Sequence, residues 1–103
     1  MAQLNRVELR GLIGTARVHK IGDAEMIRFS MATNYGYQGT DGGEIIETTW
    51  HNVVAFKSDK MRDFSGLVKG AEVRVVGRLR NQRYTDANGE ERAITEIIAS
   101  KIE

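Results

Sequence analysis

The chain has 103 residues and a net charge of +1; 28% of its residues are charged and 41% are hydrophobic. This length fits one domain with a modest core, and the near-neutral balance is not the strongly basic one that indicates nucleic-acid binding by itself. The absence of cysteine excludes disulfides and cysteine-based metal or redox chemistry. No apolar run is long enough to span a membrane and no signal peptide is recognisable, so we expect an intracellular protein.

The 11 glycines and the absence of proline suit a strand-rich fold, because every strand residue keeps its N–H donor and glycine supplies the bends. Residues 4–14 and 25–33 alternate apolar and polar side chains, which predicts two half-buried strands. Residues 34–44 contain four glycines and predict a mobile loop. Residues 45–56 are rich in β-branched and aromatic side chains, which predicts a long third strand.

A short amphipathic helix is expected over residues 57–70. Its apolar side chains recur at spacings of three and four: Met61, Phe64, Leu67 and Val68. Ser58 is the expected N-cap, and Gly66 or Gly70 is the expected stop at the C-terminal end.

Two further strands are expected after this helix. Residues 71–79 show clean alternation, whereas residues 91–102 fit a helix nearly as well as a strand. The Asn88-Gly89 turn signal just before them favours a strand in a hairpin. Three strands, a helix and two strands are the order of an OB-fold, a closed five-stranded barrel with one short helix between strands 3 and 4. We therefore expect one all-β domain over residues 1–103.

Catalysis is not expected. The two histidines, His19 and His51, lie in separate segments, and no nucleophile, zinc or phosphate-loop motif occurs. His51 is interpreted as structural, in the core or at a subunit contact. Glu44 and Glu47 near Asp41 are interpreted as solvated loop charges rather than a cation site.

The aromatic residues are more informative. Phe29 and Phe64 fall on apolar phases and are assigned to the core. The other five have polar neighbours: Tyr35, Tyr37, Trp50, Phe56 and Tyr84. Strand alternation puts Trp50 and Phe56 on one face, which points outward if Val53 faces the core.

Basic side chains cluster beside these aromatics. Arg28 and Arg74 fall on the outward phase of their strands, and Lys57 follows Phe56. Three arginines precede Tyr84 and one follows the turn: Arg78, Arg80, Arg83 and Arg92. Exposed rings stack unpaired bases, at ~1–3 kcal/mol per base, while cations bind phosphates, so the pattern predicts binding of single-stranded nucleic acid. No candidate recognition helix for a duplex groove is present.

Each of these features also has a structural explanation. Trp50 could be a half-buried barrel residue, Tyr84 a cross-strand packing partner, and the arginine row an ordinary solvated face. Tyr35 and Tyr37, in a glycine-rich segment, have the weakest structural reason to be aromatic. All the structural explanations must hold at once for binding to be absent, which favours the binding interpretation.

Five stretches of the chain match a known pattern: NRVELRGLIG, IRFSMATN, ETTWHNVVAF, LVKGAEVRVVGRLR and YTDANGEERAITEI. In this order they cover nearly the whole chain and resemble the DNA-binding domain of the bacterial single-stranded DNA-binding proteins, the SSB family. The resemblance implies an OB-fold and a homotetramer that wraps single-stranded DNA. It also implies sequence-tolerant binding in DNA replication, recombination and repair, by a cytoplasmic, nucleoid-associated bacterial protein.

The resemblance further implies the residues of the site. Bases would stack on four aromatics: Tyr37, Trp50, Phe56 and Tyr84. Phosphate contacts are implied at matching basic positions: Arg6, Lys69, Arg80 and Arg83. Strand phase and neighbouring aromatics add three more candidates: Arg28, Lys57 and Arg74. No catalytic residue, metal or cofactor is expected.

The sequence departs from the family pattern in places. The segment after Gly14 is shorter and lacks D-P-E, Asn52 stands where a basic residue is common, and Arg74 where an aromatic is common. The family normally continues with a flexible linker and an acidic tip that recruits repair and replication partners. If Glu103 ends the complete protein, that recruitment is expected to be absent; a chain truncated before such a tail is the other interpretation.

Two alternatives stay open. The short length favours a protein-interaction OB module that resembles the dimeric primosomal proteins, and the full aromatic set opposes it. A mobile-element or phage-type single-stranded DNA-binding protein would perform the same chemistry in another genetic setting. A dimer in solution would support the interaction module, and a tetramer the SSB interpretation.

Overall fold

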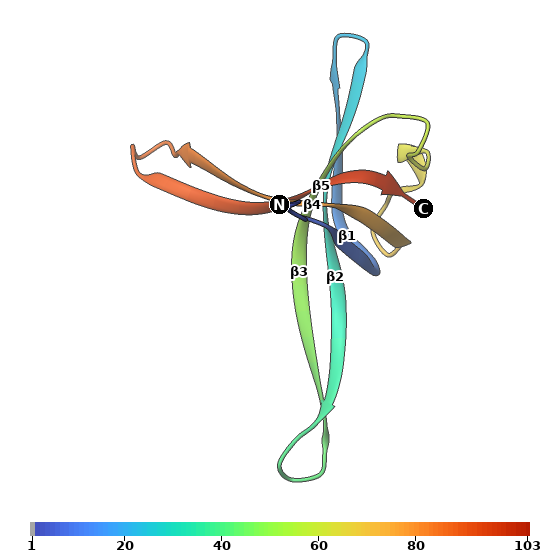
Figure 1. Cartoon of the computed structure of the whole chain (residues 1–103), viewed down its shortest axis with the longest axis vertical. Coiled ribbons are helices and arrows are strands. Elements are labelled where there is room, and N and C mark those ends of the chain that lie inside the picture. The colour runs from blue at the N-terminus through green and yellow to red at the C-terminus, as the bar shows by residue number, and fades with distance from the viewer. Residues whose placement is uncertain (1) are drawn as a thin grey trace.

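Five strands close into a barrel in the order β1-β2-β3-β5-β4 in the computed structural model, which describes residues 2–103 (Figure 1). Their bounds are Val7–Ile21 (β1), Ala24–Gln38 (β2), Glu44–Phe56 (β3), Glu72–Thr85 (β4) and Glu91–Ile102 (β5). All neighbours pair antiparallel except β3 and β5, which pair parallel through only two residue pairs, Val53↔Ile97 and Val54↔Ile98. The predicted all-β five-stranded barrel is confirmed.

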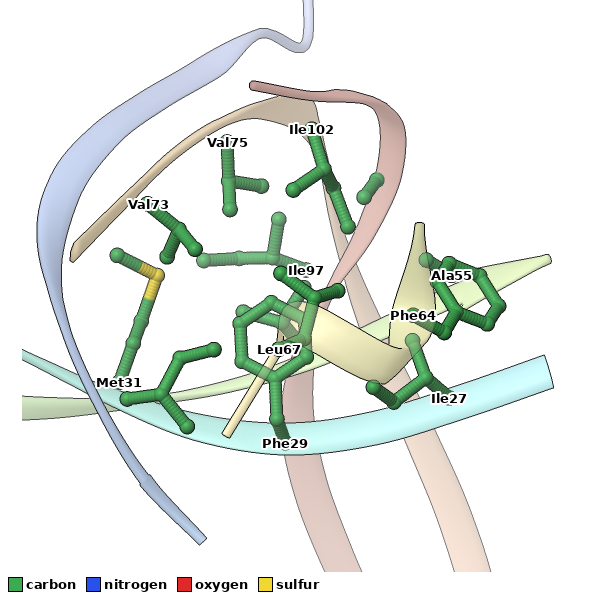
Figure 2. Packing of buried hydrophobic residues seen from close by; sticks show 13 residues of the cluster. Ile27, Phe29, Met31, Ala55, Phe64, Leu67, Val73, Val75, Ile97 and Ile102 are labelled. Carbon is green, nitrogen blue, oxygen red and sulfur yellow. The ribbon is translucent and has the colours of Figure 1, made fainter. Parts of the chain in front are cut away.

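The core fills the inside of the barrel. On β2 the inward phase supplies Ile27, Phe29 and Met31, which are buried, as strand alternation requires. Phe64 and Leu67, from the connection between β3 and β4, are buried in the same cluster. Figure 2 shows both of them packed among side chains from the strands. The inward side is therefore closed to a ligand, and any site must lie on the outside of the barrel.

Three hairpins extend from the barrel in different directions (Figure 1). The expected mobile loop over residues 34–44 is wrong for most of its length, because β2 and β3 stay paired from Asn34↔Thr48 to Gln38↔Glu44. Only the tip turns, and there the Gly43 N–H donates to Asp41 Oδ1 at 2.9 Å. This paired extension, residues 34–38 with 44–48, is called the β2–β3 arm. Both of its faces are exposed, so its sequence shows no apolar alternation.

The first and fourth strands are also longer than expected. The first continues past Gly14 to Ile21 and turns at Gly22, whose φ of 60° favours glycine. The fourth continues past Leu79 to Thr85. As in the β2–β3 arm, these extensions lie beyond the barrel and have few buried side chains to show a period.

The expected amphipathic helix over residues 57–70 is a single three-residue 3₁₀ turn, Phe64–Gly66. Its N-cap is Asp63, whose carboxylate accepts from the Ser65 N–H, and not Ser58. The residues just before this turn pair with the end of β5, where the Ile102 carbonyl accepts a hydrogen bond from the Arg62 N–H at 3.0 Å. This pairing replaces the helix, and the apolar spacing of three reflects Phe64 and Leu67 entering the core.

No helix among residues 2–103 is long and apolar enough to cross a membrane.

Candidate functional site

A groove of about 510 Å³ runs over the outer face of the barrel. Its walls come from β1, β2, β3 and β5, and include Thr15, Arg28, Ser30, Asn52, Val54 and Glu96. Arg28 pairs with Val54, and Ser30 with Asn52, on neighbouring strands. Directly paired residues share a face, so these four side chains form the floor where β2 and β3 cross the groove.

Trp50 and Phe56 lie on this same outer face, at either end of the groove segment of β3. Val53 and Ala55 are buried, whereas Trp50 is 60% exposed and Phe56 is 53% exposed. The predicted outward orientation of both rings is confirmed. The two positions are six residues apart, about 20 Å along the strand at ~3.3 Å per residue.

Tyr84, 50% exposed, extends the surface along the β4–β5 hairpin. It shares a hairpin face with Arg80, whose partner across the hairpin is Glu96, a residue of the groove wall. Arg83 lies on the opposite face of the hairpin, where its Nη1 donates to Glu91 Oε1 at 3.1 Å. The structure therefore connects Tyr84 to the groove and turns its sequence neighbour Arg83 away.

Tyr37 lies farther out, on the β2–β3 arm. It pairs with Ile45 near the tip and is 43% exposed. Its ring centroid is 6.2 Å from that of Tyr35, with the two planes tilted by 32°. By strand alternation these two tyrosines lie on the opposite phase from Trp50. The arm therefore carries its own aromatic pair, separate from the groove.

Glu96 is the central charged residue of the groove, and sequence reasoning missed it. Only 1% of its side chain is exposed, yet it faces two cations. Arg28 Nη1 donates to Glu96 Oε2 at 2.8 Å, and Arg80 Nη2 donates to Oε1 at 2.7 Å. Burial by itself raises the pKa of Glu96, but the hydrogen bonds from Arg80 and Arg28 outweigh it and hold the pKa below its ordinary value.

A sequence signal for this cluster does exist. Glu96 is an acid within an apolar run, and Arg28 and Arg80 were both selected from strand phase or resemblance. What the sequence does not show is that β2, β4 and β5 bring the three together. Arg80 Nε is buried and has no hydrogen-bond partner among residues 2–103, so this guanidinium is fixed by its outer nitrogen Nη2.

Of the basic candidates only Arg28 lines the groove, and Arg80 is joined to the groove through Glu96. The other candidates do not line it. Arg74 is held on the β1–β4 face by Glu8 and by Glu103, the latter at 2.8 Å. The hydrogen bond from Arg74 is the main cause that lowers the pKa of Glu8. Arg6 lies 3.8 Å from the same carboxylate.

Lys57 and Lys69 are exposed in the connection between β3 and β4. Lys57 directly follows Phe56, and its N–H donates to the Glu25 carbonyl at 2.9 Å. Lys69 precedes Gly70, whose N–H donates to the Ile13 carbonyl at 2.8 Å. Lys57 is therefore fixed at the Phe56 end of the groove, and Lys69 beside the bend of β1.

The site offers flat rings and fixed cations, and little else. Within residues 2–103 no group of three acidic or histidine side chains is arranged to hold a metal ion. The His51 ring is hydrogen-bonded to Thr33, with 2.8 Å between Nε2 and Oγ1, and burial lowers the pKa of His51. Stacking and phosphate contact are the chemistry that this surface can perform.

A closed five-stranded barrel with an outer groove between hairpin arms defines an OB-fold of the oligonucleotide-binding type. The chain belongs to the single-strand binding protein family, whose model matches residues 4–103.

Curated relatives are similar over nearly the whole chain. A single-stranded DNA-binding protein of Xanthomonas axonopodis is 36% identical over 97% of this chain, and one of Xanthomonas campestris is 35% identical over 97%. One of Neisseria meningitidis is 30% identical over 96%. The chain spans between 57% and 59% of the length of these relatives.

Solved structures show the same fold. The SSB of Plasmodium falciparum in complex with single-stranded DNA is 28% identical and superposes with a TM-score of 0.80, covering all of this chain and 94% of that one. A small single-stranded DNA-binding protein from Streptomyces coelicolor superposes with a TM-score of 0.71 over all of this chain and 94% of that one. At 21% identity the second comparison supports the fold alone.

Proposed function

We propose that this chain binds single-stranded DNA without strong sequence preference, by stacking bases on exposed rings and holding phosphates with arginine and lysine. One observation carries the proposal: Trp50, Phe56 and Tyr84 are each at least half exposed, beside or along the face of a groove lined by Arg28 and Glu96. Arg80 is fixed to that groove by its hydrogen bond to Glu96. Rings placed this way accept any base, because every base has a π-face.

Within the proposed site the residues have different roles. Trp50, Phe56 and Tyr84 stack bases at the groove, and Tyr37 stacks a base on the β2–β3 arm. Arg28, Arg80 and Lys57 bind phosphates at the groove, and Lys69 binds one beside β1. Arg28 and Arg80 share the single carboxylate of Glu96, so one positive charge of the pair is left for a phosphate. Arg6 and Arg74 are paired with Glu8, and Arg83 is paired with Glu91, so a phosphate would have to displace those partners.

The direct experiment is a titration with unlabelled oligo(dT). Trp50 is the only tryptophan, so its fluorescence reports on the groove alone. Stacking should quench the emission, and affinity should fall as salt rises, because phosphate contacts release counterions. Absence of both quenching and retention at low salt would reject the proposal. A duplex of the same length should bind more weakly, and equal affinity would contradict base stacking.

We further propose that the chain acts as a homotetramer in the bacterial cytoplasm, associated with the nucleoid, in replication, recombination and repair. Large apolar side chains outside the groove support a self-association surface: Leu12, Val18, Ile21 and Leu79 are exposed. Light scattering should then give four times the 11.5 kDa chain mass. A dimer would instead favour a protein-interaction module.

A further inference from the structure

The first strand has an irregularity directly beside the groove. β1 pairs with β2 at Ile13↔Met31 and again at Ala16↔Phe29, so Gly14 and Thr15 together oppose the single residue Ser30. This is the geometry of a β-bulge. The Thr15 N–H donates to Ser30 Oγ at 3.0 Å, and the two hydroxyl oxygens are also 3.0 Å apart. Side-chain bonds therefore hold the bulge in place.

The indole of Trp50 reaches this bulge from a strand that is not its neighbour. Ala32 of β2 pairs with Leu12 on one side and with Trp50 on the other, so the ring crosses β2 to reach β1. A Cβ added at Gly14 would lie 2.5 Å from Cζ3 and 2.9 Å from Cη2 of Trp50. The φ of Gly14 is not positive, so the glycine is required for space rather than for backbone conformation.

From this geometry we infer that Gly14 is a positioning residue for Trp50. The Ser30–Thr15 hydrogen bonds fix the backbone at Gly14, and the outer edge of the indole packs against the Cα of Gly14, which has no side chain. This contact sets the orientation in which the ring meets a base. The inference rests on the proposed function, because it concerns how that site is prepared for stacking.

The physical basis is preorganisation. A large side chain on an open surface samples several rotamers, and ordering it on binding opposes affinity. Contact at Cζ3 and Cη2 restrains the ring at its far edge while 60% of the residue remains exposed. The ring is therefore oriented before a base arrives.

Gly14→Ala tests the inference. The added methyl must displace the ring, so near-ultraviolet circular dichroism and acrylamide quenching of Trp50 should change in the DNA-free protein. Affinity for oligo(dT) should fall by about threefold or more, and by less than in Trp50→Ala, for which stacking energies indicate about 5- to 150-fold. Gly66→Ala, where the nearest atoms to an added Cβ are 3.8 Å away on Arg62, is the control and should change neither readout.

Gly14→Ala in a Trp50→Phe variant distinguishes a role in positioning Trp50 from a role in holding the β-bulge. Variants that lack Trp50 have no tryptophan, so their affinity is measured by the anisotropy of a labelled oligo(dT). In Trp50→Phe we expect the smaller ring not to reach Gly14, so adding Gly14→Ala should change affinity by less than about twofold. An equal loss in both backgrounds would overturn the inference and assign Gly14 to folding. Unchanged Trp50 spectra in Gly14→Ala would also overturn it, whether or not DNA binds. Failure of the unsubstituted protein to bind oligo(dT) would instead reject the proposed function.

Discussion

Arg28 of β2 and Glu96 of β5 are joined by a 2.8 Å hydrogen bond, although their strands are not neighbours in the barrel. β3 lies between them, so the bond crosses the outer face of that strand at the groove. Arg80 completes the cluster from β4. One buried carboxylate thus connects β2, β4 and β5, and its single negative charge is shared by two arginines.

Glu96→Gln should destabilise the fold. The substitution keeps the shape but leaves Arg28 and Arg80 facing each other without a counter-charge. Removing one member of a buried ion pair is strongly unfavourable, and because both arginines are part-exposed we expect a loss of about 1–3 kcal/mol in the free energy of unfolding by urea. The matched control is Glu91→Gln, whose exposed pair with Arg83 should contribute less than about 1 kcal/mol. Equal losses of unfolding free energy in the two variants would contradict a larger stabilising contribution from the buried Glu96.

Stability should fall in acid partly through this carboxylate. Because the folded state lowers the pKa of Glu96 below 4.5, ionised Glu96 contributes stability that is full above that value. The contribution is lost as pH falls through the lower folded-state pKa. The difference in unfolding free energy between the unsubstituted protein and Glu96→Gln should therefore be constant near neutral pH and shrink in acid. A difference that grows below pH 4.5 would show the opposite sign of the shift.

Salt dependence of DNA binding should identify the phosphate contacts. Each phosphate neutralised on a single strand contributes about 0.7 to the slope of log affinity against log salt concentration. The substitution of Arg28 and Arg80 by glutamine should lower that slope by up to about 1.4. Glu96→Gln is included in the same variant, so that no buried carboxylate is left without a partner. Arg83→Gln is the matched control, because Arg83 faces away from Tyr84 and is held by Glu91. If Arg83→Gln lowers the slope as much per substituted arginine, the bound DNA leaves the groove along the other face of the β4–β5 hairpin.

Tyr84→Ala should weaken oligo(dT) binding by ~1–3 kcal/mol, the value of one stacked base. Tyr84→Phe keeps the ring and should bind nearly as well, since stacking needs the flat face and not the hydroxyl. Trp50 remains in both variants, so its fluorescence reports the affinity of each. Binding by Tyr84→Ala at full strength would remove the β4–β5 hairpin from the proposed site.

The barrel and its core could be predicted from the sequence, because residues such as Ile27, Phe29 and Met31 alternate where one face of a strand is buried. The outward direction of Trp50 and Phe56 followed from the same rule. Arms such as residues 34–38 could not be predicted as strands, because both of their faces are exposed and carry no period. The spacing of apolar residues in 57–70 predicted a helix wrongly, because backbone pairing with the end of β5 determines the conformation of this segment.

The two least predictable features of the site are both long-range. Glu96 is 68 residues from Arg28, and nothing local in the sequence indicates that they meet. Gly14 meets Trp50 only because the bulge in β1 and the small Ala32 let the indole cross β2. Strand order and register create these contacts, so a pattern within one strand cannot reveal them.

The parallel junction between β3 and β5 contains only two residue pairs, and it is the shortest pairing in the barrel. Among the pairings that close the barrel, this junction has the fewest backbone bonds, so we expect it to open at the lowest free-energy cost once the exposed arms have exchanged. The charged cluster around Glu96 lies across the same edge and partly compensates for the missing backbone bonds. We therefore expect protonation of Glu96 to loosen the β3–β5 junction, which lies beneath the surface where DNA is proposed to bind.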